Sequence, residues 1–426
     1  MTYNLLIVFF LIFCFPVIGP LNSAYIALSL AIAKVCSCGR INLLVRFYRN
    51  NYIKILIWAS LGITILCGGW TYLLGSYDYS LTAAFFSLFI GLWMTIIVVA
   101  SLCYKNYDND FFERLVVNVF VIQACISIAA FISPSIREVV HHFQFANEAE
   151  KSEEAYAGFR GLAISGRLFF EFAATCGLVS IVQFRRIIKI HSTSIVEYLK
   201  LFLIIICGFF AGRTSIIGFG FGIIYLFLYK SSIKSKFKIL GRLLSILFVC
   251  VVVCVVVMPS YILDFITLHF IPWVFDLLIK YHETGSTEDS ASFNNLNQMY
   301  QYVHITAEEW IHGSGIFMDL HGGYYKQVDG GYIRHLLYWG IIGSIFNILY
   351  GLLYFIKPYV NSKSRNEHIY IILIVAFTFL VHYKGDLATT SRFYHVPLVI
   401  ILLQYVFNPI NKLCHGTNRH CPAVGG

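Results

Sequence analysis

The segment Tyr261-Ile-Leu-Asp-Phe-Ile-Thr-Leu-His-Phe-Ile-Pro-Trp273 opens the longest interruption in a chain that is otherwise strongly apolar. The interruption continues through a polar stretch and ends near His335. The opening segment is aromatic but carries Asp264 and His269, which favour a helix lying along a membrane surface over one that crosses it. We therefore predict one large extramembrane loop over residues 263–335, flanked by bundles of membrane-spanning helices.

The composition of the whole chain is that of a membrane protein. Hydrophobic residues make up 58% of the 426 positions and charged residues only 12%, and long apolar runs recur throughout. This pattern predicts an all-α polytopic membrane protein with eleven or twelve transmembrane helices. The number stays open because Pro16, Gly19 and Pro20 interrupt the first apolar run, over residues 4–33, which forms either one long span or two short ones.

The positions of Lys and Arg assign the two sides of the membrane. Basic residues gather in short connections such as 185–189 and 230–242, which the positive-inside rule places in the cytoplasm. The net charge of +9 is therefore an orientation signal, and we expect no nucleic-acid partner. The predicted parts are N-terminal transmembrane helices (1–133), an outer loop (134–167), central transmembrane helices (168–262), the large outer loop (263–335), C-terminal transmembrane helices (336–408) and a cytoplasmic tail (409–426).

Six basic residues lie at or near the outer ends of predicted spans, against the usual charge bias. They are Arg160, Arg167, Arg213, Arg334, Lys384 and Arg392. One interpretation is that each anchors to lipid phosphates at the membrane surface. As a set they predict binding of a lipid diphosphate, because a guanidinium presents a planar fork of donors to phosphate oxygens. Each such charged hydrogen bond contributes about 1.5–3 kcal/mol.

Candidate catalytic groups come from one span entry and from the large loop. Glu171 follows Arg167 by four residues, so the two face each other on a helix, either as a structural ion pair or with Glu171 accepting a proton from an acceptor hydroxyl. The large loop contributes histidines that serve either as general bases or as ordinary surface groups. These are His304, His312, His321 and His335. We take Glu171, His335 and His312 as the candidate catalytic residues.

Several other features receive a structural interpretation. Asp329 before Gly330-Gly331 is predicted to cap the following helix rather than to act in catalysis. The Tyr and Trp residues of the outer loops suit either a membrane-interface belt or stacking on sugars. None of the twelve cysteines falls in an outer loop, so no disulfide framework is expected there. The histidine spacings and the tail pair Cys414 and Cys421 do not match known metal motifs, so no metal site is expected.

The order of these parts resembles that of a Wzy-type O-antigen polymerase, within the O-antigen ligase and polymerase group. The resemblance rests on Arg160-Gly161 and Arg167 before a span, Gly212-Arg-Thr-Ser215 between two short apolar runs, Trp310-Ile-His-Gly-Ser-Gly315, Asp329-Gly-Gly-Tyr332 and Trp339-Gly-Ile-Ile-Gly343. Members of this group often carry an arginine where this chain has Ser292-Phe-Asn-Asn295. Arg334 or Lys326 would have to replace that phosphate contact.

The resemblance implies a metal-independent glycosyltransferase of the GT-C type that uses no cofactor. It would lie in the bacterial inner membrane, with two large periplasmic loops and an active site that faces the periplasm. The enzyme would transfer a growing glycan from undecaprenyl diphosphate to an incoming lipid-linked repeat unit, and membrane lipids and a Wzz-type chain-length co-polymerase would be its partners. Arginines 160, 167, 213 and 392 would hold phosphate, and Glu171 or a loop histidine would activate the acceptor hydroxyl.

Two other functions stay open on the sequence. An O-antigen ligase would move the glycan to lipid A–core, and short motifs separate it poorly from a polymerase. A flippase for lipid-linked oligosaccharides belongs to a different class. The large outer loops and the nearly charge-free centres of the predicted spans favour an enzyme over a flippase.

Overall fold

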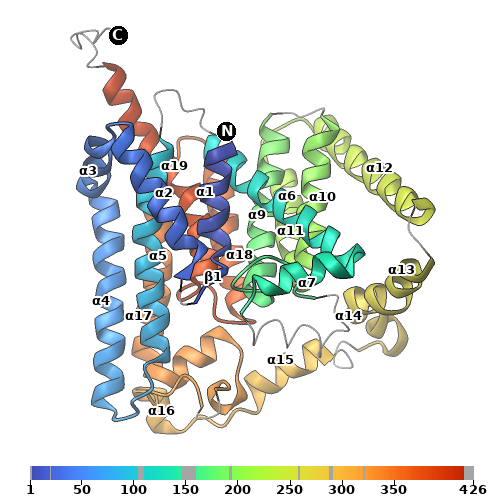
Figure 1. The fold of residues 1–426 in the computed structure, drawn as a ribbon. Coiled ribbons are helices and arrows are strands. Elements are labelled where there is room, and N and C mark those ends of the chain that lie inside the picture. Colours follow the sequence, from blue (N-terminus) through green and yellow to red (C-terminus); the bar gives the residue numbers. More distant parts are fainter. Residues whose placement is uncertain are drawn as a thin grey trace.

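The computed structural model is a bundle of helices with one small β hairpin in the part of the chain that it describes (Figure 1). The described residues are 2–19, 21–103, 110–145, 160–190, 194–257, 260–286, 291–319 and 322–416. Within them, four helices are long and apolar enough to cross a membrane. They are α4 (Asn51–Leu73), α5 (Ser80–Leu102), α6 (Phe111–Ile132) and α17 (Gly331–Asn361).

A fifth crossing is formed if the bent pair α2 (Ser23–Ser37) and α3 (Ile41–Arg49) is one span, although its two helices meet at 113°. Each 23-residue helix among these spans about 35 Å, enough for the hydrocarbon core of a bilayer. The prediction of an all-α, multi-pass membrane protein is therefore confirmed, while the prediction of eleven or twelve spans stays a prediction.

The first apolar run forms two helices. Helix α1 (Thr2–Phe13) ends before a hairpin of β1 (Pro16–Ile18) and β2 (Leu21–Asn22), and α2 follows directly. Asn22 accepts a hydrogen bond from the Ala24 N–H and caps α2. Of the two possibilities for residues 4–33, the structure has the pair of short helices.

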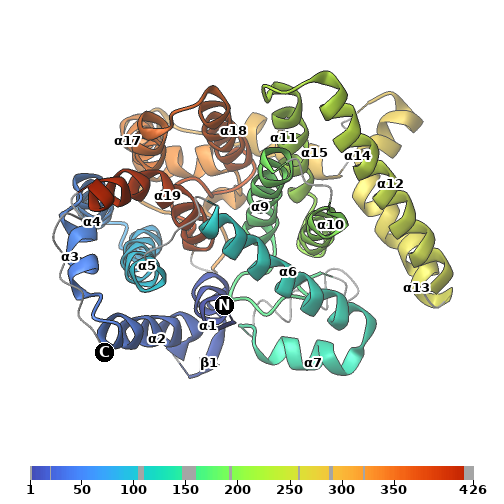
Figure 2. The same cartoon turned by 90° about the horizontal axis from the view of Figure 1, so that it is seen from above.

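Helix α9 (Phe170–Lys189) is the centre of the bundle. It packs against α6, α10 (Ile195–Phe209), α11 (Ser215–Leu228), α18 (Arg365–His382) and α19 (Arg392–Gly416), and Figure 2 shows it surrounded by them. A Cβ on Gly218 of α11 would lie 2.3 Å from Gly177 Cα of α9. Two glycines at this crossing therefore let the backbones of α9 and α11 approach closely, as small residues do in membrane helix pairs.

Helix α12 (Ile233–Val257) diverges from the bundle and leads to helices that lie along one end of it (Figure 1). Among the described residues, the large loop is largely helical and the first outer loop contains one short helix. Their elements are α7 (Pro134–His142), α13 (Ser260–Phe265), η1 (Ile266–Phe270), α14 (Ile271–Thr284), α15 (Ala291–Gln301), α16 (Ala307–Ile311) and η2 (Tyr325–Gln327). The aromatic segment 261–273 is helical, as predicted, in α13, η1 and the start of α14.

The large loop docks into a break in α17. The break falls at Trp339 and Gly340, where Gly340 has φ +67°. The N–H groups of Ser314 and Gly315 donate to the carbonyls of Leu337 and Tyr338, at 2.7 and 2.8 Å. The Gly-Ser-Gly segment 313–315 thus donates hydrogen bonds to carbonyls of α17 that lie just before the kink at Gly340.

Candidate functional site

A cavity of about 870 Å³ lies where the first turns of α9, α17 and α19 come together. Its charged lining residues are Arg167, Glu171, Asp329, Arg334, Asp386 and Arg392, and Ser391 is among its hydroxyl groups. Helices α9 and α17 have no side-chain cap at their N-termini. Because the N-terminus of a helix carries partial positive charge and unbonded N–H groups, these helix starts add positive potential near the cavity.

Arg334 is a buried cation at this cavity. Its guanidinium lies between two rings, 3.7 Å from the Phe317 centroid and 3.8 Å from the Tyr324 centroid. The residue is 7% exposed, and its Nε has no hydrogen-bond partner. Two ring faces hold the guanidinium plane in place, but no carboxylate of the described residues forms a salt bridge with it. A buried charge with an unbonded donor favours an anionic ligand.

Arg392, the first residue of α19, has a similar environment. Its aliphatic part packs on Gly91 of α5, where an added Cβ would lie 2.8 Å from the Arg392 Cγ. Its Nη2 contacts the Met94 sulfur at 3.3 Å, and its buried Nε lacks a partner. Among the residues that the structure describes, Arg392 too has no salt bridge.

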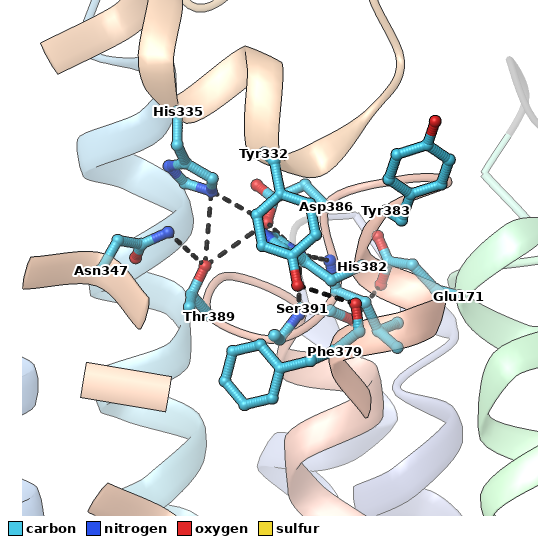
Figure 3. Close-up of polar contacts among 12 residues, drawn as sticks. Glu171, Tyr332, His335, Asn347, Phe379, His382, Tyr383, Asp386, Thr389 and Ser391 are labelled. Atoms are coloured by element: carbon cyan, nitrogen blue, oxygen red, sulfur yellow. Dashed lines mark hydrogen bonds and ion pairs between the residues drawn. The ribbon is translucent and has the colours of Figure 1, made fainter. Parts of the chain in front are cut away.

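Glu171 joins α9 to α19. Its Oε1 lies 3.7 Å from the Arg167 Nε, so the predicted contact is present. Arg167 precedes α9, however, so the two residues do not face each other on one helix as predicted. Its Oε2 accepts a hydrogen bond of 2.6 Å from the Ser391 Oγ (Figure 3). The Glu171 side chain is 26% exposed and that of Arg167 is 59% exposed. Glu171 is thus a carboxylate at the cavity that remains accessible from solvent.

Asp329 is not a helix cap, and that prediction was wrong. Gly330 is the N-cap of α17, and no side chain bonds there. Asp329 instead lines the cavity. Burial raises the pKa of Asp329, and the nearby charges of Arg334 and Lys384 only partly oppose that shift.

A second carboxylate at the cavity, Asp386, forms an ion pair with His335. The His335 Nε2 lies 3.0 Å from the Asp386 Oδ1, and Thr389 bridges the pair (Figure 3). Burial alone would raise the pKa of Asp386, but His335, His382 and Arg334 outweigh it and hold that pKa well below its usual range. The Asp386 side chain is 4% exposed and lines the cavity. His335 does not line the cavity and is linked to it only through Asp386.

This cluster is also the place where a metal ion would be sought. His335, His382 and Asp386 offer ligand atoms within 4.8 Å of one another. The Nδ1 of His382, however, accepts hydrogen bonds from the N–H groups of Leu387 and Ala388, at 3.1 and 3.2 Å. That nitrogen's lone pair is therefore already in use, and the cluster fits a hydrogen-bond network better than a metal centre.

Comparisons with protein-family models, with curated proteins and with solved structures found no match for this chain.

The remaining predicted cations form a second cluster beside the N-terminus of α11, which we call the α11 group: Arg160, Arg213 and Lys384. Arg160 donates two hydrogen bonds to the Ala211 carbonyl, at 3.0 and 2.6 Å. Arg213 lies 3.1 Å from an Asp276 oxygen.

Arg160 and Arg213 both lie over the Trp273 ring, at 5.4 and 4.8 Å. Lys384 contacts the Thr214 hydroxyl at 3.3 Å. Burial and the charges of Arg213 and Arg160 lower the pKa of Lys384. Within the described residues, the α11 group thus brings three cations together, of which Arg213 forms a salt bridge with Asp276.

The structure thus divides the predicted site residues between the cavity, the α11 group and other positions. Arg167, Arg334 and Arg392, which we call the cavity arginines, line one cavity with Glu171. His312 does not line it. The His312 carbonyl accepts a hydrogen bond from the Trp70 Nε1 at 2.9 Å, and its ring nitrogen contacts the Gly313 carbonyl. The His312 backbone thus contacts α4, and the catalytic role of its imidazole stays a prediction.

Sequence reasoning missed Asp386 and Ser391. Both lie in the short connection between α18 and α19, which drew attention only for its basic residues. The available signal was an aspartate and a serine in a segment that also carries Lys384 and Arg392 at a predicted outer face.

Proposed function

We propose that this multi-pass membrane protein is an O-antigen polymerase, a glycosyltransferase that acts on oligosaccharides linked to undecaprenyl diphosphate. One observation carries the proposal: the guanidinium groups of Arg334 and Arg392 reach the same cavity with unbonded nitrogens and no salt bridge in the described chain. Such groups favour a ligand with several negative oxygens, and a diphosphate is the simplest one that a lipid-linked sugar carries.

The residues of the cavity suit transfer of a glycan. The acceptor hydroxyl oxygen bonds to the anomeric carbon of the donor glycan, and the bond from that carbon to the diphosphate oxygen breaks. The hydroxyl proton passes to Glu171, which is the more exposed of the carboxylates Glu171 and Asp386. The cavity arginines stabilise the charge that develops on the departing undecaprenyl diphosphate, so the diphosphate needs no protonation as it leaves.

Asp386 is less suited to be the base. Its depressed pKa means that it holds a proton weakly, and His335 already occupies one of its oxygens. Its place near Arg334 suits orientation of the guanidinium and of a sugar hydroxyl. In this proposal His335 is a positioning residue that fixes Asp386.

The α11 group supports a polymerase because both substrates of a polymerase are lipid diphosphates. Donor and acceptor would then need two cationic sites, and the six predicted outer cations form two clusters among the described residues. The cavity arginines would hold the donor diphosphate, and Arg160, Arg213 and Lys384 would hold that of the acceptor. The charges of Arg334 and Lys384 both act to lower the pKa of Asp329. Asp329 therefore lies close to both cationic sites, which supports the view that the two sites are neighbours.

The experiment replaces Arg334 and Arg392 separately by glutamine in a deletion strain. Each loss of a charged hydrogen bond removes about 1.5–3 kcal/mol, so long glycan chains should fall about 10- to 150-fold at normal protein level. Arg365→Gln, which changes an exposed arginine at the start of α18, is the control and should leave the chain-length ladder unchanged. Wild-type ladders from both cavity variants would overturn the proposal.

The deletion strain itself separates the two closest functions. A single repeat unit on lipid A–core is expected of a lost polymerase, whereas bare core would identify a ligase. Lipid-linked single units trapped on the cytoplasmic face would identify a flippase.

A further inference from the structure

A second cavity, of about 320 Å³, lies between α10 and α12. Its lining consists of Ile195, Tyr198, Lys238, Gly241, Arg242, Ser245 and Ile246. It is at the opposite end of the bundle from the first cavity. Helix α9 begins at the first cavity and spans about 30 Å before the chain turns into α10 at Ile195. The proposed glycan chemistry therefore does not account for this cavity.

The polar part of this cavity is cationic. Lys238 and Arg242 are four residues apart on α12, so they lie on one face of the helix. Arg242 is a hydrogen-bond partner of the hydroxyl of Tyr198, which is 0% exposed. No acidic residue contributes to the lining. The nearby Glu197 is engaged elsewhere, 2.9 Å from the Lys200 Nζ and 3.6 Å from Arg186.

The cavity continues into an apolar surface. Helix α12 leaves the bundle beyond the cavity (Figures 1 and 2), and its next turns expose Leu244, Leu247 and Phe248, with Phe248 68% exposed. A Cβ on Gly241 would meet no atom within 4 Å, so the cavity is open at that point. A cationic end followed by an apolar track has the polarity of a phospholipid molecule.

We infer that this cavity binds an anionic phospholipid. The headgroup phosphate lies at Lys238 and Arg242, and an acyl chain runs along the exposed apolar face of α12. Basic pockets between membrane helices select anionic headgroups because local positive potential favours a phosphate whose charge no headgroup cation offsets. The lipid fills the wedge that α12 leaves as it diverges from α10, and so supports the helix that leads to α13 and α14.

The test uses the full-length protein in mild detergent, with bound lipid counted by native mass spectrometry. The probes are phosphatidylglycerol, phosphatidylcholine and inorganic phosphate at equal concentration. Phosphatidylglycerol should be retained at least about fivefold better than phosphatidylcholine, because each basic contact favours an anionic headgroup by about that factor. Inorganic phosphate should not displace it, since phosphate lacks the acyl chain.

Two variants change the cavity in different ways. Lys238→Gln removes one charge and should lower phosphatidylglycerol retention about fivefold. Gly241→Leu keeps the charge and fills the open space, and should lower it at least as much. The double variant Lys234→Gln, Lys236→Gln removes charge from the same helix outside the cavity lining and should change retention little.

Equal retention of the two lipids, full displacement by inorganic phosphate, or wild-type retention by Gly241→Leu would overturn the inference. The readout is lipid binding, so none of these three outcomes depends on whether the protein transfers glycans.

Discussion

Glu171 and Ser391 are 220 positions apart in the chain, yet the Ser391 hydroxyl donates a 2.6 Å hydrogen bond to the Glu171 carboxylate. Ser391 also accepts a hydrogen bond from the Tyr394 N–H at 3.2 Å, and so caps α19. One hydroxyl therefore fixes both the start of α19, where Arg392 lies, and the carboxylate at the start of α9. Ser391 therefore links Glu171 to the segment that carries Arg392.

Ser391→Ala should lower glycan transfer more than it lowers stability. Loss of a cap costs about 1 kcal/mol, while Glu171 loses the donor that orients it. The matched control is Ser364→Ala, which removes the cap of α18, where Ser364 accepts the Glu367 N–H. Both variants should lose similar thermal stability, and only Ser391→Ala should lose most polymer formation. Equal activity in the two variants would contradict a role for this contact.

Gly91→Ala tests the position of Arg392 without touching its charge. The added methyl group would come within 3.0 Å of the Arg392 Cγ, so the arginine has to move. Overpacking of this kind costs about 1–3 kcal/mol, partly offset by the better helix propensity of alanine. We expect loss of long chains at near-normal protein level. Gly62→Ala in α4, where nothing lies within 4 Å, should leave chain length unchanged.

Gly313→Ala should release the large loop from α17. A Cβ there would lie 2.3 Å from the Tyr338 backbone, and Gly313 has φ +73°. Gly322→Ala has a similar φ of +79° but meets no atom within 4 Å, so it measures backbone strain alone, about 1 kcal/mol. Limited proteolysis should cut the loop of the Gly313 variant much faster than that of the Gly322 variant. Equal cleavage rates would mean that the loop does not depend on this close packing.

Glu309 makes the large loop sensitive to acid. Burial alone would raise the pKa of Glu309, but hydrogen bonds from Lys326 and the Thr306 N–H outweigh it and hold that pKa below its usual value. A carboxyl with a lowered folded-state pKa stabilises the fold above its unfolded pKa of about 4.3 and loses this contribution as pH falls through the folded value. Protease resistance of the loop should therefore decrease below about pH 4.3.

Glu309→Gln should lower loop stability at pH 7 by about 1–2 kcal/mol and make protease resistance less dependent on pH. Glu308→Gln, at the exposed neighbouring position, is the control and should behave as the wild type at both pH values. An unchanged pH profile in the Glu309 variant would assign the acid sensitivity to another group.

The sequence by itself determined the class of the protein and the local elements. Apolar runs longer than about 20 residues have few alternatives to membrane helices. The two short apolar runs around Gly212-Arg-Thr-Ser215 also became α10 and α11. Each of these features depends on neighbours within a few turns of one helix.

Only the tertiary structure decided which charged residues share a cavity. The unbonded nitrogens of Arg334 and Arg392, the hydroxyl of Ser391 and the histidine behind Asp386 come from elements far apart in the chain. Their meeting depends on how α9, α17 and α19 cross, and helix crossing depends on side-chain packing that no local pattern encodes. For the same reason Asp329 could not be distinguished from a helix cap, and His312 could not be assigned to the loop contact with Trp70.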